Sequence, residues 1–198
     1  MNDEAESFRC QSGFSSPPCL ASEVAPDYFD PLAVDPQQAR DVARWRKAER
    51  TRLRAYRMAL SVEQRQDVGD AVAGHLRQVL RERFYGARGM VFSAYWPIKG
   101  EPDLRPLMAV LHASGVNIAL PVVESKAAPL VGWTAEGFRL GYGGGYFDRT
   151  LAALDPRPFA IGIGFDAARL ETIYPQPHDI PVDLILTEAG ILQPPARD

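Results

Sequence analysis

Short apolar segments alternate with helical patterns through the second half of the chain, and this alternation constrains the fold most. Residues 90–95, 116–123, 158–165 and 182–187 have the length and apolar content of strands. Residues 104–113 have a helical pattern and separate the first two of them. Strands separated by helices favour a largely parallel sheet that is covered on both faces. We therefore predict an α/β fold of the three-layer αβα type, a mostly parallel, Rossmann-like sheet between helices.

Two longer helices are predicted before these strands. Asp35 can cap a helix that has Pro36 at its first position and runs to about residue 60. Ser61 and Gln64 form a capping-box pattern, which begins the second helix. The first helix has an apolar stripe on its core-facing side. Four arginines line the adjacent stripe: Arg46, Arg50, Arg54 and Arg57, with Lys47 at its margin.

The 198 residues fit one domain with a substantial core, preceded by an extension. Residues 1–36 contain five prolines and no sustained periodicity, so we expect an N-terminal extension that is partly disordered. Residues 37–192 would form the single α/β domain. The formal net charge of -3 does not suggest a nucleic-acid partner or an anionic membrane. No apolar run reaches membrane-spanning length, and the acidic start lacks a signal-peptide pattern, so we expect a cytoplasmic protein.

The run RLGYGGGYFDR at residues 139–149 carries the strongest functional signal. Glycine lets a backbone approach another group closely and adopt positive φ. Such a loop can turn its N–H groups onto an anion where a helix begins, and residues 148–154 read as that helix. Asp148, just past this phosphate cradle, is well placed for Mg²⁺. The alternative is a glycine-rich turn between packed elements; the run is not a P-loop, because no GK[ST] follows.

These residues resemble the 5-formyltetrahydrofolate cyclo-ligase family, also called 5,10-methenyltetrahydrofolate synthetase. That family carries a G-x-G-x-G-Y-[YF]-D loop preceded by Arg-Leu, as here. Three further blocks match in the family's order: AERTRLRAYRMALSVEQR, FSAYWPIKGEPDLRPL and PHDIPVDLILTE. The resemblance covers most of residues 44–188. It implies ATP-dependent cyclisation of 5-formyltetrahydrofolate, polyglutamylated or not, to 5,10-methenyltetrahydrofolate, with release of ADP and phosphate and with Mg²⁺ as cofactor.

The resemblance also implies a set of site residues. Arg139 and Tyr146 would be catalytic, and Asp148 and Asp179 would hold Mg²⁺. The folate would contact Ile98, Glu101, Asp103, Tyr142, Gly143, Gly144, Gly145 and Tyr146. ATP would contact Arg46, Lys47, Arg50, Arg139, Leu140, Gly141, Tyr142, Gly143, Gly144, Gly145, Tyr146 and Phe147.

Three of these assignments have simpler alternatives. A row of basic residues on a helix is usually a solvated face, which is the other interpretation of Arg46, Lys47 and Arg50. Asp103 can cap the helix that follows it. Asp179 can be a turn residue before Pro181.

The chain departs from the family between residues 124 and 137. In the family, a hairpin, a turn and a further strand separate the strand at 116–123 from the glycine loop, which is residues 141–145 in this chain. Here the sequence passes almost directly from one to the other. We interpret this as an internal deletion around residues 124–137, with residues 129–133 supplying a truncated strand. The lost strand would be central, so its loss would remove ladder partners and buried apolar surface.

Two other functions stay open. A degenerate homologue would bind nucleotide without turning over folate, and the short region at 124–137 favours this interpretation. A nucleic-acid-binding protein would use the arginine-rich helix, but the net negative charge and the helix's apolar stripe count against it. We expect no nucleic acid and no membrane among the partners, and either a monomer or a homodimer.

Overall fold

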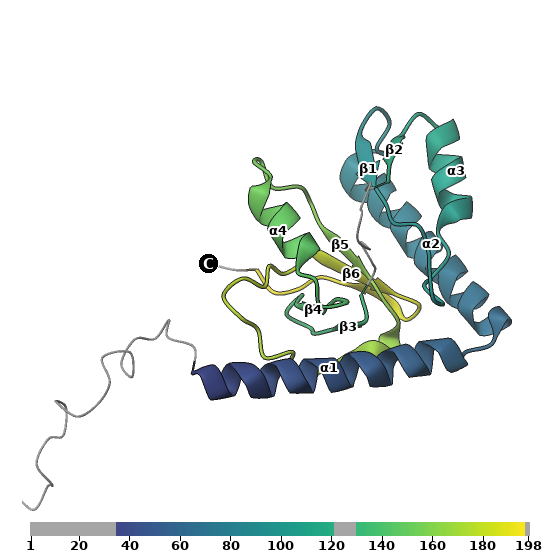
Figure 1. The fold of residues 1–198 in the computed structure, drawn as a ribbon. Helices are drawn as coiled ribbons and strands as arrows, with labels where there is room; N and C mark the ends of the chain where they lie inside the picture. The colour runs from purple at the N-terminus through teal and green to yellow at the C-terminus, as the bar shows by residue number, and fades with distance from the viewer. Residues whose placement is uncertain (1–34, 121–129, 197–198) are drawn as a thin grey trace, which may run out of the picture. The chain divides into compact units, whose positions relative to one another are not determined.

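The computed structural model describes residues 35–120 and 130–196. The predicted extension therefore lies almost entirely outside the described residues. The chain divides into two compact units, Met1–Ala39 and Arg40–Asp198. The elements that build the candidate site belong to the second unit (Figure 1). None of the described helices combines the length and the apolar character needed to cross a membrane.

Both long helices begin where predicted, and the first also ends where predicted. Helix α1 (Pro36–Ala59) begins after Asp35, whose Oδ1 accepts the backbone N–H of Gln37 at 2.8 Å. Helix α2 (Val62–Phe84) has a complete capping box between Ser61 and Gln64. Because these signals are local in sequence, the helix starts follow from the residues at the ends alone.

The strands form three small sheets within the described residues. Strand β1 (Val91–Ser93) pairs in parallel with β2 (Asn117–Ala119), and α3 (Arg105–Ala113) connects them. Strand β3 (Gly132–Trp133) pairs antiparallel with β4 (Arg139–Leu140). Strand β5 (Ile161–Ile163) is parallel to β6 (Leu184–Thr187), which is antiparallel to β7 (Gly190–Leu192). The α/β class is confirmed, whereas a single three-layer sheet stays a prediction.

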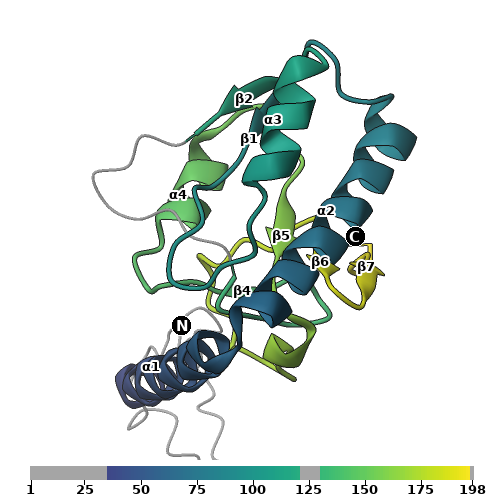
Figure 2. The ribbon, with the colours of Figure 1, turned by 90° about the vertical axis from the view of Figure 1, so that its right-hand side faces the viewer.

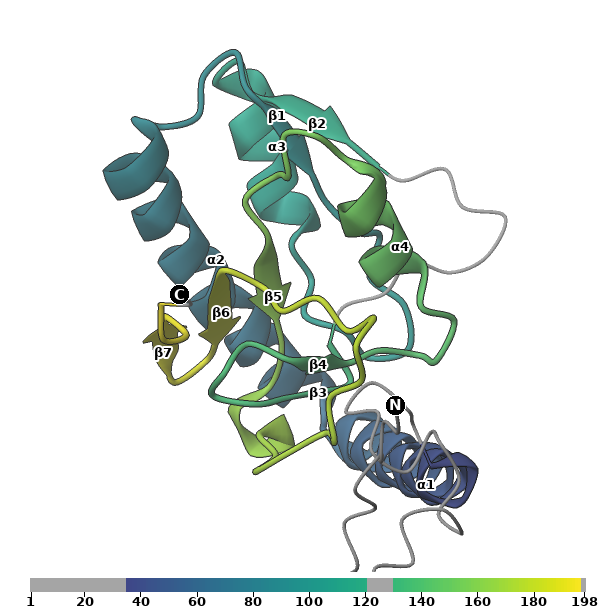
Figure 3. The same cartoon turned by 90° about the vertical axis from the view of Figure 1, so that its left-hand side faces the viewer.

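Helices flank the strands on two sides. Helix α2 packs against β6 and β7, and α3 packs against β2 (Figure 2). Helix α4 (Tyr146–Ala153) follows the glycine loop, and β5 runs between α2 and α4 (Figures 1 and 3). All four residues of β6 are buried, as expected of a strand that packs on both faces. The β6 core side chains supply about 1.5–3 kcal/mol each through burial.

The segment after the short central region takes a strand-like course. The backbone N–H of Leu130 donates to the carbonyl of Ile163 at 3.2 Å, and that of Leu170 donates to the carbonyl of Trp133 at 2.8 Å. A Cβ on Gly132 would lie only 2.8 Å from Leu53 Cδ1, so glycine here lets α1 pack closely on β3. The predicted truncated strand is thus confirmed as β3. Residues 124–129 of the predicted deletion site fall outside the described residues.

Candidate functional site

The glycine loop lies against the arginine stripe of α1. Gly143 has a φ of +98° and Gly145 a φ of +61°, and α4 begins directly after them. Arg50 Nε donates to the carbonyl oxygen of Gly141 at 2.7 Å, and a Cβ on Gly143 would lie 3.4 Å from Arg50 Cζ. Burial and the neighbouring Arg46 lower the pKa of Arg50, although its ordinary value is high enough to keep it charged. The structure therefore brings an α1 arginine to the predicted cradle.

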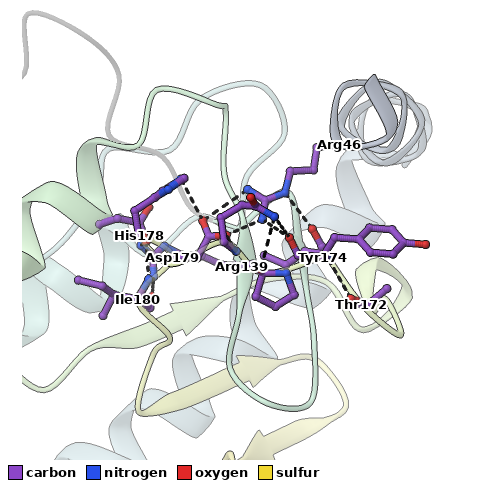
Figure 4. Close-up of polar contacts among 11 residues, drawn as sticks. Arg46, Arg139, Thr172, Tyr174, His178, Asp179 and Ile180 are labelled. Carbon is purple, nitrogen blue, oxygen red and sulfur yellow. Dashed lines mark hydrogen bonds and ion pairs between the residues drawn. The ribbon is translucent and has the colours of Figure 1, made fainter. Parts of the chain in front are cut away.

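Arg46 lies one helical turn before Arg50 on α1 and pairs with Asp179 (Figure 4). Its guanidinium donates to both carboxylate oxygens of Asp179 and to the carbonyls of Ile173 and Tyr174. Both side chains of the ion pair are about nine-tenths buried, at 11% and 10% exposed. Burial alone would raise the pKa of Asp179, but hydrogen bonds from Arg46 and from the Gln176 backbone outweigh it and hold the pKa below the ordinary value.

Arg139 is paired in the same way with the other predicted metal ligand. Its Nη2 donates to Asp148 Oδ1 at 2.5 Å, its Nη1 donates to the Ile180 carbonyl, and its guanidinium lies 4.0 Å from the centre of the Phe147 ring. Burial lowers the pKa of Arg139, and the charge of Asp148 opposes that shift. The resulting arrangement fixes the guanidinium beside the start of α4.

The two predicted metal ligands lie next to each other. The backbone N–H of Ile180, which follows Asp179, donates to Asp148 Oδ1 at 2.9 Å. Mg²⁺ prefers oxygen ligands and often takes only one or two carboxylates beside substrate phosphates, so this pair fits the ion by type and number. In this structure each carboxylate is engaged by an arginine. Residues 35–120 and 130–196 contain no group of three or more His, Cys, Asp or Glu side chains that could hold a metal.

Three of the residues assigned to folate belong to the segment between β1 and α3. Ile98, Glu101 and Asp103 all line an open pocket of about 510 Å³, together with Arg65 and Lys99. Asp103 is 40% exposed at its side chain and accepts the backbone N–H of Arg105 at the start of α3. It therefore also fits the simpler interpretation as a residue that orders the start of the helix.

Glu101 is fully enclosed, in contrast to Asp103. Its side chain is 0% exposed; one oxygen accepts the backbone N–H of Ile98 and the other accepts the Tyr142 hydroxyl, both at 2.8 Å. Arg57 Nη2 lies 3.7 Å from the same oxygen. Burial raises the pKa of Glu101, and these hydrogen bonds and the positive charge oppose the shift.

Three other predicted residues are exposed. Lys47 is exposed on α1, and Tyr146 and Phe147 are 45% and 42% exposed at the start of α4. Sequence reasoning did not assign Arg57 to the site. Its place on the stripe of Arg46 and Arg50 was visible, but its partners lie 42 and 85 residues away in the chain.

Residues 127–188 match the sequence model of the 5-formyltetrahydrofolate cyclo-ligase family. The curated 5-formyltetrahydrofolate cyclo-ligase of Mycoplasma pneumoniae is 37% identical over 66 residues. The predicted resemblance is confirmed. That sequence match spans 33% of this chain and 40% of the relative's length, so the chain covers well under two thirds of it by sequence.

Solved structures extend the similarity to most of the fold. A 5,10-methenyltetrahydrofolate synthetase from Mycoplasma pneumoniae superposes with a TM-score of 0.61 and 23% identity, over 72% of this chain and 98% of that one. The Aquifex aeolicus 5,10-methenyltetrahydrofolate synthetase superposes with a TM-score of 0.63 and 25% identity, over 77% and 95%. The fold is therefore shared with these enzymes over nearly their whole length.

Proposed function

We propose that this protein catalyses the ATP-dependent cyclisation of 5-formyltetrahydrofolate to 5,10-methenyltetrahydrofolate, with release of ADP and phosphate. The observation that carries the proposal is the glycine loop at the start of α4 with Arg46, Arg50 and Arg139 beside it. Backbone N–H groups at a helix start and converging guanidiniums are the features that bind a triphosphate. The match of residues 127–188 to the family supports the choice of reaction.

The chemistry needs an activated oxygen. The formyl oxygen attacks the γ-phosphorus, ADP leaves, and the product is a phosphorylated imidate. N10 then attacks the formyl carbon and loses its proton to solvent, and phosphate departs as the ring closes. An amide oxygen is a poor leaving group, and phosphorylation corrects this. The protein's part is to orient the two substrates and to neutralise phosphate charge. We assign that neutralisation to Arg46, Lys47, Arg50 and Arg139.

The loop residues would contact both substrates. The backbone from Gly141 to Gly145 would cradle the phosphates, with Leu140 and Phe147 at its ends. The rings of Tyr142 and Tyr146 would line the folate, and Tyr146 would act with Arg139 at the reacting phosphate. Mg²⁺, when held by Asp148 and Asp179, would supply positive charge at the phosphate oxygens.

The pterin end of the folate would lie at Ile98, Glu101 and Asp103. Asp103 has an exposed carboxylate that can accept hydrogen bonds from amino and ring N–H groups of a pterin. The pocket of about 510 Å³ along these residues supports this placement. We further propose a cytoplasmic enzyme, monomeric or homodimeric, without nucleic-acid or membrane partners.

The short central region keeps one alternative open, a degenerate homologue that binds nucleotide without turnover. The test follows methenyltetrahydrofolate by its absorbance with ATP, 5-formyltetrahydrofolate and Mg²⁺ all present, and with each omitted. Product that depends on all three supports the proposal. Saturable Mg·ATP binding without product would indicate the degenerate homologue, and salt-dependent polyanion binding alone would indicate a nucleic-acid-binding protein.

The metal assignment has its own test in the same assay. The substitution Asp148→Asn removes the charge that Mg²⁺ needs and keeps the size of the side chain. We expect the magnesium concentration for half-maximal rate to rise while the thermal unfolding curve keeps its cooperative form. A magnesium titration identical to that of the unchanged protein would restrict Asp148 to its ion pair with Arg139.

A further inference from the structure

A buried polar network joins three segments that are distant in sequence. Arg57 of α1 donates through Nε to the carbonyl of Lys99 at 3.1 Å and through Nη2 to the hydroxyl of Tyr142. The Tyr142 hydroxyl donates in turn to Glu101. Arg57 and Glu101 are only 3% and 5% exposed. The network thus ties the glycine loop, through Tyr142, to the segment 98–101, with Arg57 between them.

The members of this network satisfy one another. A buried ion pair is tolerated when hydrogen bonds occupy its remaining donors and acceptors, and removing one partner leaves an uncompensated charge. Here both Glu101 oxygens and the Tyr142 hydroxyl have partners. The geometry of all three segments is therefore set jointly.

We infer that Arg57 is a positioning residue, which holds the glycine loop in register with the segment 98–101 so that the nucleotide and the folate meet. The inference rests on the proposed function. In that function, residues 141–145 hold the phosphates and residues 98–103 border the folate. The planar guanidinium suits this task, because its donors reach two acceptors on different segments at once. A lysine at this position has a single point charge and would keep one contact at most.

The network requires an ionised Glu101. The groups that face its carboxylate are Arg57 from α1, Tyr142 from the glycine loop, Tyr95 after β1, and Lys99 on its own segment. Burial raises the pKa of Glu101, while the Tyr142 hydroxyl and the charges of Arg57 and Lys99 oppose that rise. Removing Arg57 or the hydroxyl therefore raises the pKa further. The network would then be lost at a higher pH than in the unchanged protein.

The experiment compares Arg57→Met, Arg57→Lys and Tyr142→Phe in the full chain, with Arg52→Met as control. Arg52 lies on the same helix but is exposed and pairs with Glu49. We expect kcat/KM for the folate to fall by about 10–100-fold in the first three variants, the cost of a misplaced substrate.

The acid limb of the pH profile of kcat/KM should move to higher pH in Arg57→Met and Tyr142→Phe. Arg57→Met together with Tyr142→Phe should be hardly worse than Arg57→Met alone, because both changes break one network.

Hydrogen exchange provides a readout that does not depend on turnover. Amide exchange should speed up at residues 98–101 and 139–145 together in Arg57→Met and Tyr142→Phe, and not in Arg52→Met. Unchanged exchange, or an unmoved acid limb with full activity, would overturn the inference. If Arg57→Met does not fold, the same measurements on Tyr142→Phe, which loses only a hydroxyl, test the inference. If the unchanged protein makes no product while exchange still couples the two segments, the proposed function fails and the coupling by Arg57 stands.

Discussion

The arginines near the glycine loop differ in what neutralises them. Arg46 and Arg139 each face an aspartate, and Arg57 lies beside Glu101. Arg50 donates instead to a backbone carbonyl, that of Gly141. A carbonyl neutralises less charge than a carboxylate, so of these four arginines Arg50 retains the most positive charge to offer to a ligand. Its position beneath Gly143 puts that charge at the loop.

Replacing Arg50 should therefore weaken nucleotide binding more than it affects the fold. We expect Arg50→Ala to weaken ATP binding by about 1.5–3 kcal/mol, the worth of a charge-assisted contact. Calorimetry with Mg·ATP measures this. Arg52→Ala on the same helix should change the affinity little, because Arg52 is exposed. Equal ATP affinities for Arg50→Ala and the unchanged protein would remove Arg50 from the site.

The ion pair of Asp179 should make stability depend on pH in the acid range. An unfolded aspartate has a pKa of about 3.9, and the folded-state pKa of Asp179 is lower. Its contribution is therefore present above about pH 4 and is lost as pH falls through the folded value. Urea unfolding from pH 7 to pH 2 should show the gap between the unchanged protein and Asp179→Asn closing in that window.

A second substitution controls for the loss of one negative charge. Asp67→Asn changes an exposed residue of α2. We expect its free energy of unfolding to follow that of the unchanged protein across the same pH range. A gap for Asp179→Asn that does not narrow at all as the pH falls below about 4 would mean that the side chain stabilises the fold by packing and not by its charge.

At the scale of elements, the glycine loop combines two kinds of glycine. Gly143 has positive φ and lies against Arg50, whereas a Cβ on Gly141 would meet no atom within 4 Å. Of these two positions, only Gly143 therefore requires glycine for its backbone conformation. A side chain at position 141 would enter open space.

The two glycines should respond differently to alanine. Gly143→Ala should cost about 1–2 kcal/mol of stability, because an alanine pays that amount in the left-handed region. Its Cβ would only contact Arg50, at 3.4 Å from Cζ, so the cost comes from the backbone conformation. Gly141→Ala should leave stability nearly unchanged. Thermal melts of the two variants measure these effects. Equal melting temperatures for both variants would contradict the assignment of strain to Gly143.

Local signals predicted the elements well, and the long-range contacts less well. The capping box at Ser61 and the apolar stripe of the first long helix depend on neighbours in sequence, and α1 and α2 begin at the expected residues. The pairing of Arg46 with Asp179 and of Arg57 with Tyr142 joins residues 133 and 85 positions apart. No periodicity encodes such partners. The resemblance predicted that Arg46, Asp148 and Asp179 lie at one site. It did not indicate that arginines would form ion pairs with the two aspartates.

At the scale of the whole chain, the strands lack a common sheet among the described residues. Strands β1 and β2 pair only with each other there, and β5, β6 and β7 form a separate sheet. Val91 of β1 is 70% exposed and Leu120 after β2 is 43% exposed. Residues 130–133 lie beside β5 but contribute only two residues to β3. This is the pattern expected if a strand between the two sheets is missing from the sequence.

Restoring the family's hairpin, turn and strand between residues 123 and 130 should raise both stability and activity. One strand buries apolar side chains worth several kcal/mol at ~25 cal/mol per Å², comparable with a domain's whole margin of ~5–15 kcal/mol. We expect the chain as it stands to melt at a lower temperature and to form methenyltetrahydrofolate more slowly than the restored chain.

A Gly/Ser insert of equal length is the control, since it adds chain without an apolar face. A chain without any insert that is as stable and as active as the restored chain would show that the segment is dispensable. Equal gains from the Gly/Ser insert would show that chain length, and not a buried strand, was lacking. A restored protein that folds but does not convert 5-formyltetrahydrofolate would contradict the proposed reaction itself.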